Sequence, residues 1–245
     1  MTPGIQRHAN MSQLLDNTPK SFVRTLVLFY LVVKGLVGSV LLFGSFPYYF
    51  YYYNVTGIEY QMYTTLGLLP WGCKSVIGLL TDNHPIRGYH KRWYAYIAAV
   101  ALPLWLVGIA ASDNPDVMAV MMTGASTSIM TLDALIEGQY MSNVRFRNAD
   151  KGTASFTWQC IMAGSMIGPV IIGLCSSGPE DVANIRYAFV ATIFLSLPFS
   201  FMVLRYPANV FNDDAVVTDL NKSILRDDDE DARTTHGFTN GGMIQ

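Results

Sequence analysis

The chain has 245 residues, of which 51% are hydrophobic and only 14% are charged, and its formal net charge at pH 7 is −2. A mean hydropathy of +0.28 with so few charges excludes an ordinary soluble domain. We therefore expect an all-α membrane protein that crosses the bilayer several times. The three cysteines, Cys73, Cys160 and Cys175, all lie within apolar segments, which gives no sign of a disulfide framework.

Six apolar segments are close to the ~20 residues that a helix needs to cross a bilayer. They are residues 26–50, 62–80, 93–111, 117–138, 153–175 and 187–204. Residues 1–21 contain no short apolar core before a cleavage site, so we expect a cytoplasmic tail and no removable signal peptide. Residues 22–205 then form a six-helix transmembrane domain. Residues 206–245 carry an acidic run and little apolar content, which predicts a disordered cytoplasmic tail.

Lysine and arginine residues are distributed unevenly between the two sides of this arrangement. If the N-terminus is cytoplasmic, the segments on that side hold thirteen of the 16 basic residues, and the opposite side holds only Arg186. Short cytoplasmic loops carry such an excess in membrane proteins, so we expect both termini in the cytoplasm. The aromatic run 48–53 then falls at the outer interface, where amphipathic rings are favoured.

Two lysines, Lys34 and Lys74, lie inside the first two predicted spans. At 1.5 Å per residue, both are roughly 12 to 15 Å from the cytoplasmic surface, near the midplane of a ~30 Å hydrocarbon core. Transporters place substrate and ion sites at this level. Each lysine therefore either faces a water-filled cavity and binds an anionic substrate, or forms a structural ion pair with Asp133; Lys34 has the further option of extending to the interface. We favour the binding role for Lys74, and leave both roles open for Lys34.

The fourth predicted span carries the opposite charge. Asp133 and Glu137 are four residues apart and share one helix face. Counted from the end of the span, Asp133 lies roughly 9 Å inside the membrane and Glu137 lies at the interface. Asp133 is therefore a candidate for a role in transport, by accepting a proton or cation or by pairing with Lys74 in one conformation only, or for a permanent ion pair with Lys74. The sequence leaves both roles open.

Small residues form a second pattern in the spans. The fifth span contains Gly164, Gly168 and Gly173, and the first contains several small residues, Gly35, Gly38, Ser39 and Gly44. Such faces let helices approach closely in membranes, and we expect tight packing here more than a role in gating. Pro70 and Pro103 predict bends in the second and third spans. A bend at Pro70 frees a backbone carbonyl one turn before Lys74, which suits the lining of a cavity.

The loop after the second span contains a recognisable pattern of charges and glycines. Gly78, Asp82, Arg87, Gly88 and Arg92 occupy positions that resemble the loop between helices 2 and 3 of the major facilitator superfamily. The resemblance implies that Asp82 and Arg92 form a gate with an acid on the fourth helix, either Asp133 or Glu137. A generic basic loop is the alternative.

The second and fourth spans carry motifs that make the resemblance more specific. The segments Pro70-Trp71-Gly72-Cys73-Lys74, Gly78-Leu79-Leu80-Thr81-Asp82 and 133–140, with Trp158 and Gly164, are similar to the kinetoplastid branch of the folate-biopterin transporter family. Ser75 stands where the family has proline, and Thr81 where it has serine. The similarity covers about residues 22–205. Family members carry two six-helix halves, and this chain resembles the N-terminal half.

The resemblance implies transport of folate, biopterin, S-adenosylmethionine or a related solute, possible coupling to protons, and a pore that a second copy or another transporter half completes. Together with the depths counted above, it assigns substrate binding to Lys74, Lys34 and Trp71, and coupling or gating to Asp133, Glu137, Asp82, Arg87 and Arg92. The alternative is a non-transporting membrane subunit that assembles with or regulates a full-length relative. The lipid bilayer is the expected surrounding. Because the sequence contains no His and Cys ligand cluster, nucleophile elbow or phosphate-binding loop, we expect no enzyme activity, metal, cofactor or nucleic-acid partner.

Overall fold

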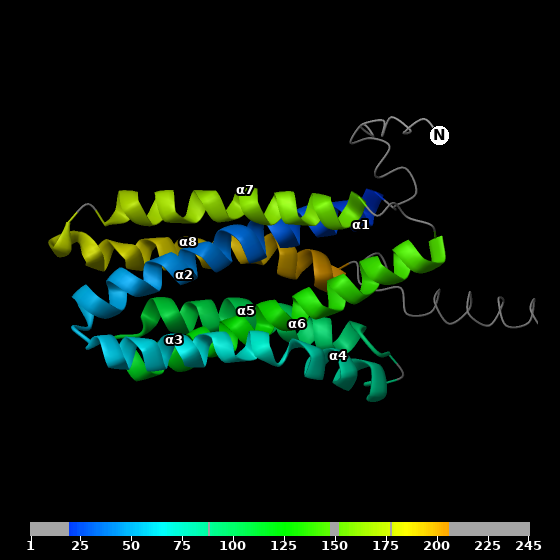
Figure 1. Cartoon of the computed structure of the whole chain (residues 1–245), viewed down its shortest axis with the longest axis horizontal. Coiled ribbons are helices and arrows are strands. Elements are labelled where there is room, and N and C mark those ends of the chain that lie inside the picture. Colours follow the sequence, from blue (N-terminus) through cyan, green and yellow to red (C-terminus); the bar gives the residue numbers. More distant parts are fainter. Residues whose placement is uncertain (1–19, 88, 148–151, 177, 206–245) are drawn as a thin grey trace, which may run out of the picture. The chain divides into compact units, whose positions relative to one another are not determined.

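The computed structural model describes residues 20–87, 89–147, 152–176 and 178–205, and in this part of the chain it contains helices and no β-strand (Figure 1). Five helical segments are long and apolar enough to cross a membrane, namely Phe22–Tyr52, Arg92–Ala111, Pro115–Met141, Gly152–Cys175 and Asp181–Arg205. They confirm the all-α membrane class and five of the six predicted spans. Residues 1–19 and 206–245, which hold most of the two predicted tails, lie outside the described residues.

The first span is a chain of four helical pieces that follow one another directly. They are α1 (Lys20–Val27), the π-helix η2 (Leu28–Val37), α2 (Gly38–Pro47) and the π-helix η3 (Tyr48–Tyr52). The sequence predicted an uninterrupted α-helix here. π-Helices are rare, and they occur often at functional sites. Lys34 lies within η2.

The second predicted span is broken, and this corrects the prediction of a single helix over 62–80. It consists of α3 (Gly57–Gly72) and α4 (Lys74–Asn83), each too short to count as a span alone. The break is at Cys73, where the backbone N–H donates to the Pro70 carbonyl at 2.9 Å in a tight last turn of α3. Pro70 was predicted to bend this span, and the interruption occurs three residues after it, immediately before Lys74.

The remaining helices are α5 (Arg92–Ala111), α6 (Pro115–Arg147), α7 (Gly152–Cys175), the short 3₁₀-helix η4 (Pro179–Asn184) and α8 (Ile185–Arg205). α5 continues through Pro103 without interruption, so the bend expected there does not break the helix. α5 packs against α6 and α8, α7 packs against η2 and α2, and α3 packs against α6 (Figure 1).

The close contact between α7 and the first span depends on glycine. A Cβ atom added at Gly164 would clash with the Leu31 carbonyl oxygen and lie 3.0 Å from the Gly35 Cα atom, and one added at Gly168 would clash with Ser39. The predicted tight packing is therefore confirmed at Gly164 and Gly168. It is not confirmed at Gly173, where an added Cβ atom would meet nothing within 4 Å among the described residues. This contact fixes the position of η2, and with it the position of Lys34.

Candidate functional site

A buried carboxylate between two lysines is the centre of the candidate site. The Asp133 side chain is only 1% exposed, and its two oxygens each accept a hydrogen bond from a different ammonium group. Lys34 Nζ lies 2.8 Å from Oδ1, and Lys74 Nζ lies 2.8 Å from Oδ2. Lys74 also pairs with Glu137 Oε2. We call Lys34, Lys74, Asp133 and Glu137 the charge cluster; with all four groups ionised, its net charge is zero.

Local structure explains how these residues meet. Asp133 and Glu137 lie one turn apart on the same face of α6, as the sequence predicted. Lys74 is the first residue of α4, because the preceding helix ends at Gly72 and Cys73 interrupts the two helices. A cation at a helix N-terminus is unfavourable on its own, since the backbone N–H groups there carry partial positive charge. The two carboxylates of α6 offset both the ammonium and this helix end.

Energetics account for the pairing. An uncompensated charge buried in a protein costs several kcal/mol. At an effective dielectric constant of 20, each 2.8 Å contact with Asp133 corresponds to about 6 kcal/mol of Coulomb attraction. The ion pair that the sequence offered as an alternative to substrate binding is therefore formed, and it is formed by both lysines.

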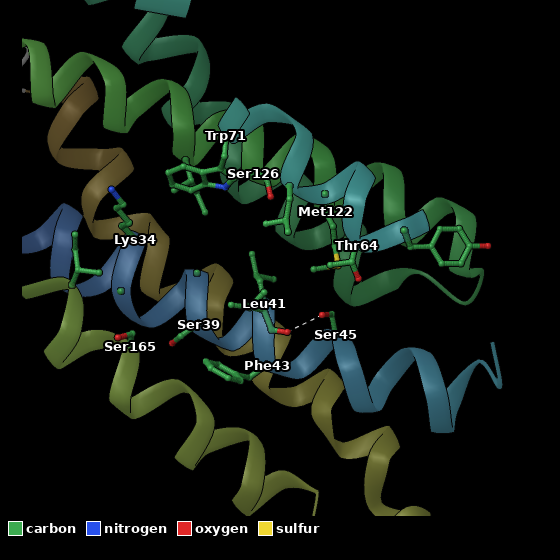
Figure 2. Close-up of a pocket in the computed structure, with 18 of the residues that line it drawn as sticks. Lys34, Ser39, Leu41, Phe43, Ser45, Thr64, Trp71, Met122, Ser126 and Ser165 are labelled. Atoms are coloured by element: carbon green, nitrogen blue, oxygen red, sulfur yellow. Dashed lines mark hydrogen bonds between the residues drawn. The ribbon is translucent and has the colours of Figure 1, made fainter. Parts of the chain in front are cut away.

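A cavity of about 360 Å³ lies next to the charge cluster, between the first span, α3, α6 and α7 (Figure 2). Its walls are mainly apolar, with hydroxyl groups from serine, threonine and tyrosine. The lining residues are Lys34, Gly35, Gly38, Ser39, Leu41, Leu42, Phe43, Ser45, Tyr49, Tyr63, Thr64, Gly67, Leu68, Trp71, Met122, Ser126, Ile129, Ile161 and Ser165. Lys34 is the charged residue among them. A concave, largely apolar site with a few polar groups is typical of small-molecule binding.

Aromatic rings surround the ammonium group of Lys34. Its Nζ atom lies 5.3 Å from the centre of the Tyr30 ring and 5.4 Å from that of Trp71, within the range of cation–π attraction. Figure 2 shows Lys34 extending from the first span toward Trp71 on α3. Of the three residues predicted to bind substrate, Lys34 and Trp71 line the cavity, whereas Lys74 belongs to the charge cluster and is not among the lining residues.

The predicted gating residues of the loop lie apart from the cluster in their described contacts. Arg87 has a positive φ of 54° and stacks over the Trp93 ring at 4.8 Å. Arg92 Nε donates to the Tyr96 hydroxyl at 2.9 Å. Asp82 is exposed, and no other described residue forms a hydrogen bond or ion pair with its side chain. The gate between these residues and α6 stays a prediction, and Gly88 lies outside the described residues.

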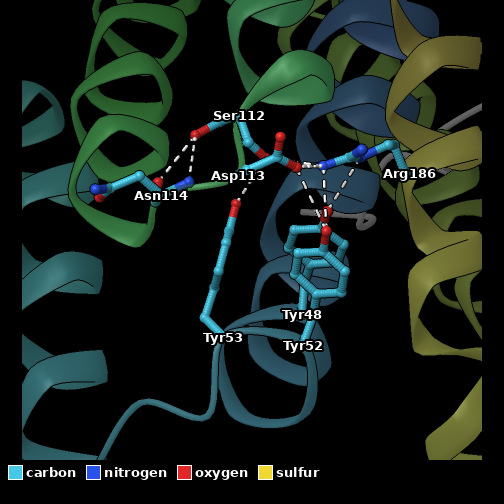
Figure 3. Close-up of polar contacts among 7 residues, drawn as sticks. All are labelled: Tyr48, Tyr52, Tyr53, Ser112, Asp113, Asn114 and Arg186. Carbon is cyan, nitrogen blue, oxygen red and sulfur yellow. Dashed lines mark hydrogen bonds and ion pairs between the residues drawn. The ribbon is translucent and has the colours of Figure 1, made fainter.

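A second polar cluster, around Arg186, was not predicted from the sequence (Figure 3). The guanidinium group, at the start of α8, pairs with Asp113 and donates to the Ser112 carbonyl at 3.0 Å and to the Tyr48 hydroxyl at 3.3 Å. The Tyr53 hydroxyl also donates to the Ser112 carbonyl, at 2.9 Å. Arg186 holds the pKa of the Asp113 carboxyl below its usual value. The signal available in the sequence was that Arg186 is the one basic residue predicted to lie on the outer side of the membrane.

Comparisons with known proteins find a matching family and two similar relatives. Residues 34–228 match the model of the BT1 family. The chain is 26% identical over 196 residues to "Probable folate-biopterin transporter 6" of Arabidopsis thaliana, a match that covers 78% of this chain and 39% of the relative. It is 31% identical over 122 residues to "Probable folate-biopterin transporter 2" of the same plant, which covers 48% of this chain and 24% of that relative. No solved structure matches.

Proposed function

We propose a transport function for this chain, which belongs to the BT1 family. In the proposal, its helices form one side of a pathway that carries a folate, a pteridine such as biopterin, or a related solute across a membrane. The single observation that carries the proposal is the cavity in which Lys34 is the charged lining residue, beside Trp71. The names of the two relatives support the solute class.

The chemistry of the cavity suits a flat heteroaromatic ring that carries an anionic group. Trp71, Tyr49 and Tyr63 offer aromatic surfaces against which such a ring can stack. Hydroxyl groups of Ser39, Ser126 and the other polar lining residues can exchange hydrogen bonds with ring nitrogens and oxygens. Lys34 supplies the positive charge for a carboxylate. Folate combines these groups, biopterin has the ring without a carboxylate, and S-adenosylmethionine has a purine ring and a carboxylate.

Proton coupling is part of the proposal, and the charge balance of the cluster supports it. Lys34 and Lys74 balance Asp133 and Glu137, so an anionic solute at Lys34 adds one uncompensated negative charge to a poorly solvated region. Uptake of one proton by Asp133 or Glu137 restores neutrality. Asp133 is the stronger candidate because it contacts the lysine that lines the cavity. We further propose that Asp82, Arg87 and Arg92 gate the cytoplasmic end of the pathway.

A second helical unit is needed to close the pathway, because the cavity opens onto the surface of the bundle. The chain spans about two fifths of the length of the first relative that it matches. Transporters of this type move two helical halves against each other around a central site. We propose that a second half covers the cavity, whether it belongs to a second copy, to another polypeptide or to further residues of the same one, and that the loop with Arg87 and Arg92 faces the cytoplasm.

The test is to measure the binding of labelled folate and biopterin to the purified protein, together with uptake of both, and of S-adenosylmethionine, by cells that produce it. We expect binding, and uptake above that of cells without the protein. Trp71→Ala should weaken binding, whereas Trp158→Ala, at an exposed position of α7 outside the cavity, should not. Binding without uptake would favour the alternative of a non-transporting subunit. Absence of both would contradict the proposal.

A further inference from the structure

The ammonium group of Lys34 contacts the buried carboxylate and also borders the cavity. Its Nζ atom bonds Asp133 Oδ1 at 2.8 Å, while the lysine side chain remains 22% exposed and lines the cavity. Asp133 is 1% exposed and is not among the lining residues. A ligand in the cavity can therefore reach Lys34 without first displacing Asp133 from its position in the bundle.

The two lysines differ in what a ligand can do to them. Lys74 binds both Asp133 and Glu137, and it does not line the cavity. Lys34 binds one carboxylate oxygen, and the other oxygen of that group is already held by Lys74. If Lys34 turns to a new partner, Asp133 keeps one ammonium contact and is not left as an unpaired buried charge. Releasing Lys74 would instead remove a contact from two carboxylates.

We propose that Lys34 determines specificity for solutes that carry a carboxylate, and that it binds them by exchanging Asp133 for the carboxylate of the solute. This proposal rests on the proposed transport function and adds to it the mode of recognition. Lys74 acts as a positioning residue in this scheme: it holds Asp133 in place during the exchange and does not touch the solute. The substrate-binding role favoured for Lys74 from the sequence thus passes to Lys34.

The surroundings of Lys34 suit such an exchange. The aromatic rings of Tyr30 and Trp71, at 5.3 and 5.4 Å, attract the ammonium group whichever carboxylate it binds. One carboxylate replaces another, so the lysine always has an anionic partner and never passes through a bare buried state. A neutral pteridine has no group that competes with Asp133. It can stack in the aromatic part of the cavity while the Lys34–Asp133 pair stays intact.

Two ligands with the same ring system separate this mechanism from a general structural role. Folate carries a glutamate tail with two carboxylates, and biopterin carries none. Binding of both to the purified protein in detergent is compared for the wild type, Lys34→Gln and Lys34→Arg. Lys74→Gln is the matched control, because it removes the other ammonium contact of the same carboxylate. Thermal unfolding of each variant shows whether it is folded.

Loss of a charge-assisted hydrogen bond of about 1.5–3 kcal/mol predicts that Lys34→Gln weakens folate binding by about tenfold or more and leaves biopterin binding within about twofold. Lys34→Arg should restore much of the folate affinity. Lys74→Gln should also weaken folate binding, because Asp133 then keeps no ammonium contact during the exchange, but adding Asp133→Asn to this variant should restore folate binding. The double variant Lys34→Gln with Asp133→Asn, in which the cluster stays neutral, should show the same selective loss if the single variant does not fold.

The proposal is overturned if Lys34→Gln and the double variant weaken folate and biopterin equally, or if Lys74→Gln loses folate selectively and Lys34→Gln does not. A wild-type protein that binds neither ligand overturns the proposed function as well, so the two failures are distinguishable.

Discussion

The contact between α7 and the first span makes a quantitative prediction for Gly164. An alanine there places its Cβ atom against the Leu31 carbonyl oxygen and 3.0 Å from the Gly35 Cα atom. Both neighbours are backbone atoms, so no change of side-chain rotamer relieves the clash and the two helices must separate. Overpacking of this kind costs about 1–3 kcal/mol, and further loss is expected because the whole interface shifts.

One favourable term opposes this cost. Alanine is a better helix former than glycine by about 1 kcal/mol, and this gain applies at any interior position of α7. The variant Gly173→Ala measures this gain in helix propensity alone, because a Cβ atom added at Gly173 meets nothing within 4 Å among the described residues. Gly164→Ala should therefore destabilise the protein, and Gly173→Ala should leave its stability unchanged or slightly increase it.

The assay is thermal unfolding of the detergent-solubilised protein, followed by the loss of its monodisperse peak in size-exclusion chromatography. For a chain of this size, 1 kcal/mol corresponds to about 2–4 °C in Tm, so Gly164→Ala should lower Tm by several degrees relative to Gly173→Ala. Equal Tm values for the two variants would refute the conclusion that α7 packs on the first span through Gly164.

Two further predictions concern charged groups. Asp133→Asn should destabilise the protein by about 3–5 kcal/mol, because it leaves two ammonium groups without their shared carboxylate. Glu137→Gln should cost less than about 1 kcal/mol, because the Glu137 side chain is 40% exposed. Similar Tm losses for the two variants would contradict this prediction. Arg186 lowers the pKa of Asp113 from its ordinary value of 3.8, so this carboxylate stabilises the fold above pH 3.8 and loses that effect as the pH falls further. The wild type should thus exceed Asp113→Asn in Tm at pH 7, and this difference should shrink as the pH falls below 3.8. A difference that stays constant below that pH would refute the assignment.

The sequence predicted the helices well where a long apolar run was the only signal. Five of the six spans follow such runs, and the small-residue face of α7 packs as expected because Gly164 and Gly35 have no side chain to separate the backbones. The break at Cys73 was not predicted at its observed position. Pro70 indicated an irregularity, but the tight turn that captures its carbonyl group depends on the local geometry of three residues.

The sequence predicted the depth of the candidate site in the membrane, but not which of the two lysines faces the cavity. Counting residues placed Lys34 and Lys74 at one depth, and the structure brings both to Asp133. Which lysine faces the cavity depends on rotation about the helix axis. The π-helix around Lys34 and the break before Lys74 set that rotation, and neither leaves a periodic pattern in segments that are apolar on all sides.

The cavity beside Lys34 is the central claim, and protection of a cavity thiol by ligand tests it most directly. In a background in which Cys73, Cys160 and Cys175 are replaced by serine, a cysteine is introduced at Ser126, which lines the cavity, or at Ser155, an exposed residue of α7 that does not. The rate of reaction with a water-soluble maleimide is measured with and without folate. We predict that folate slows the reaction at position 126 and leaves position 155 unaffected. Unchanged rates at position 126 under saturating folate would contradict the account.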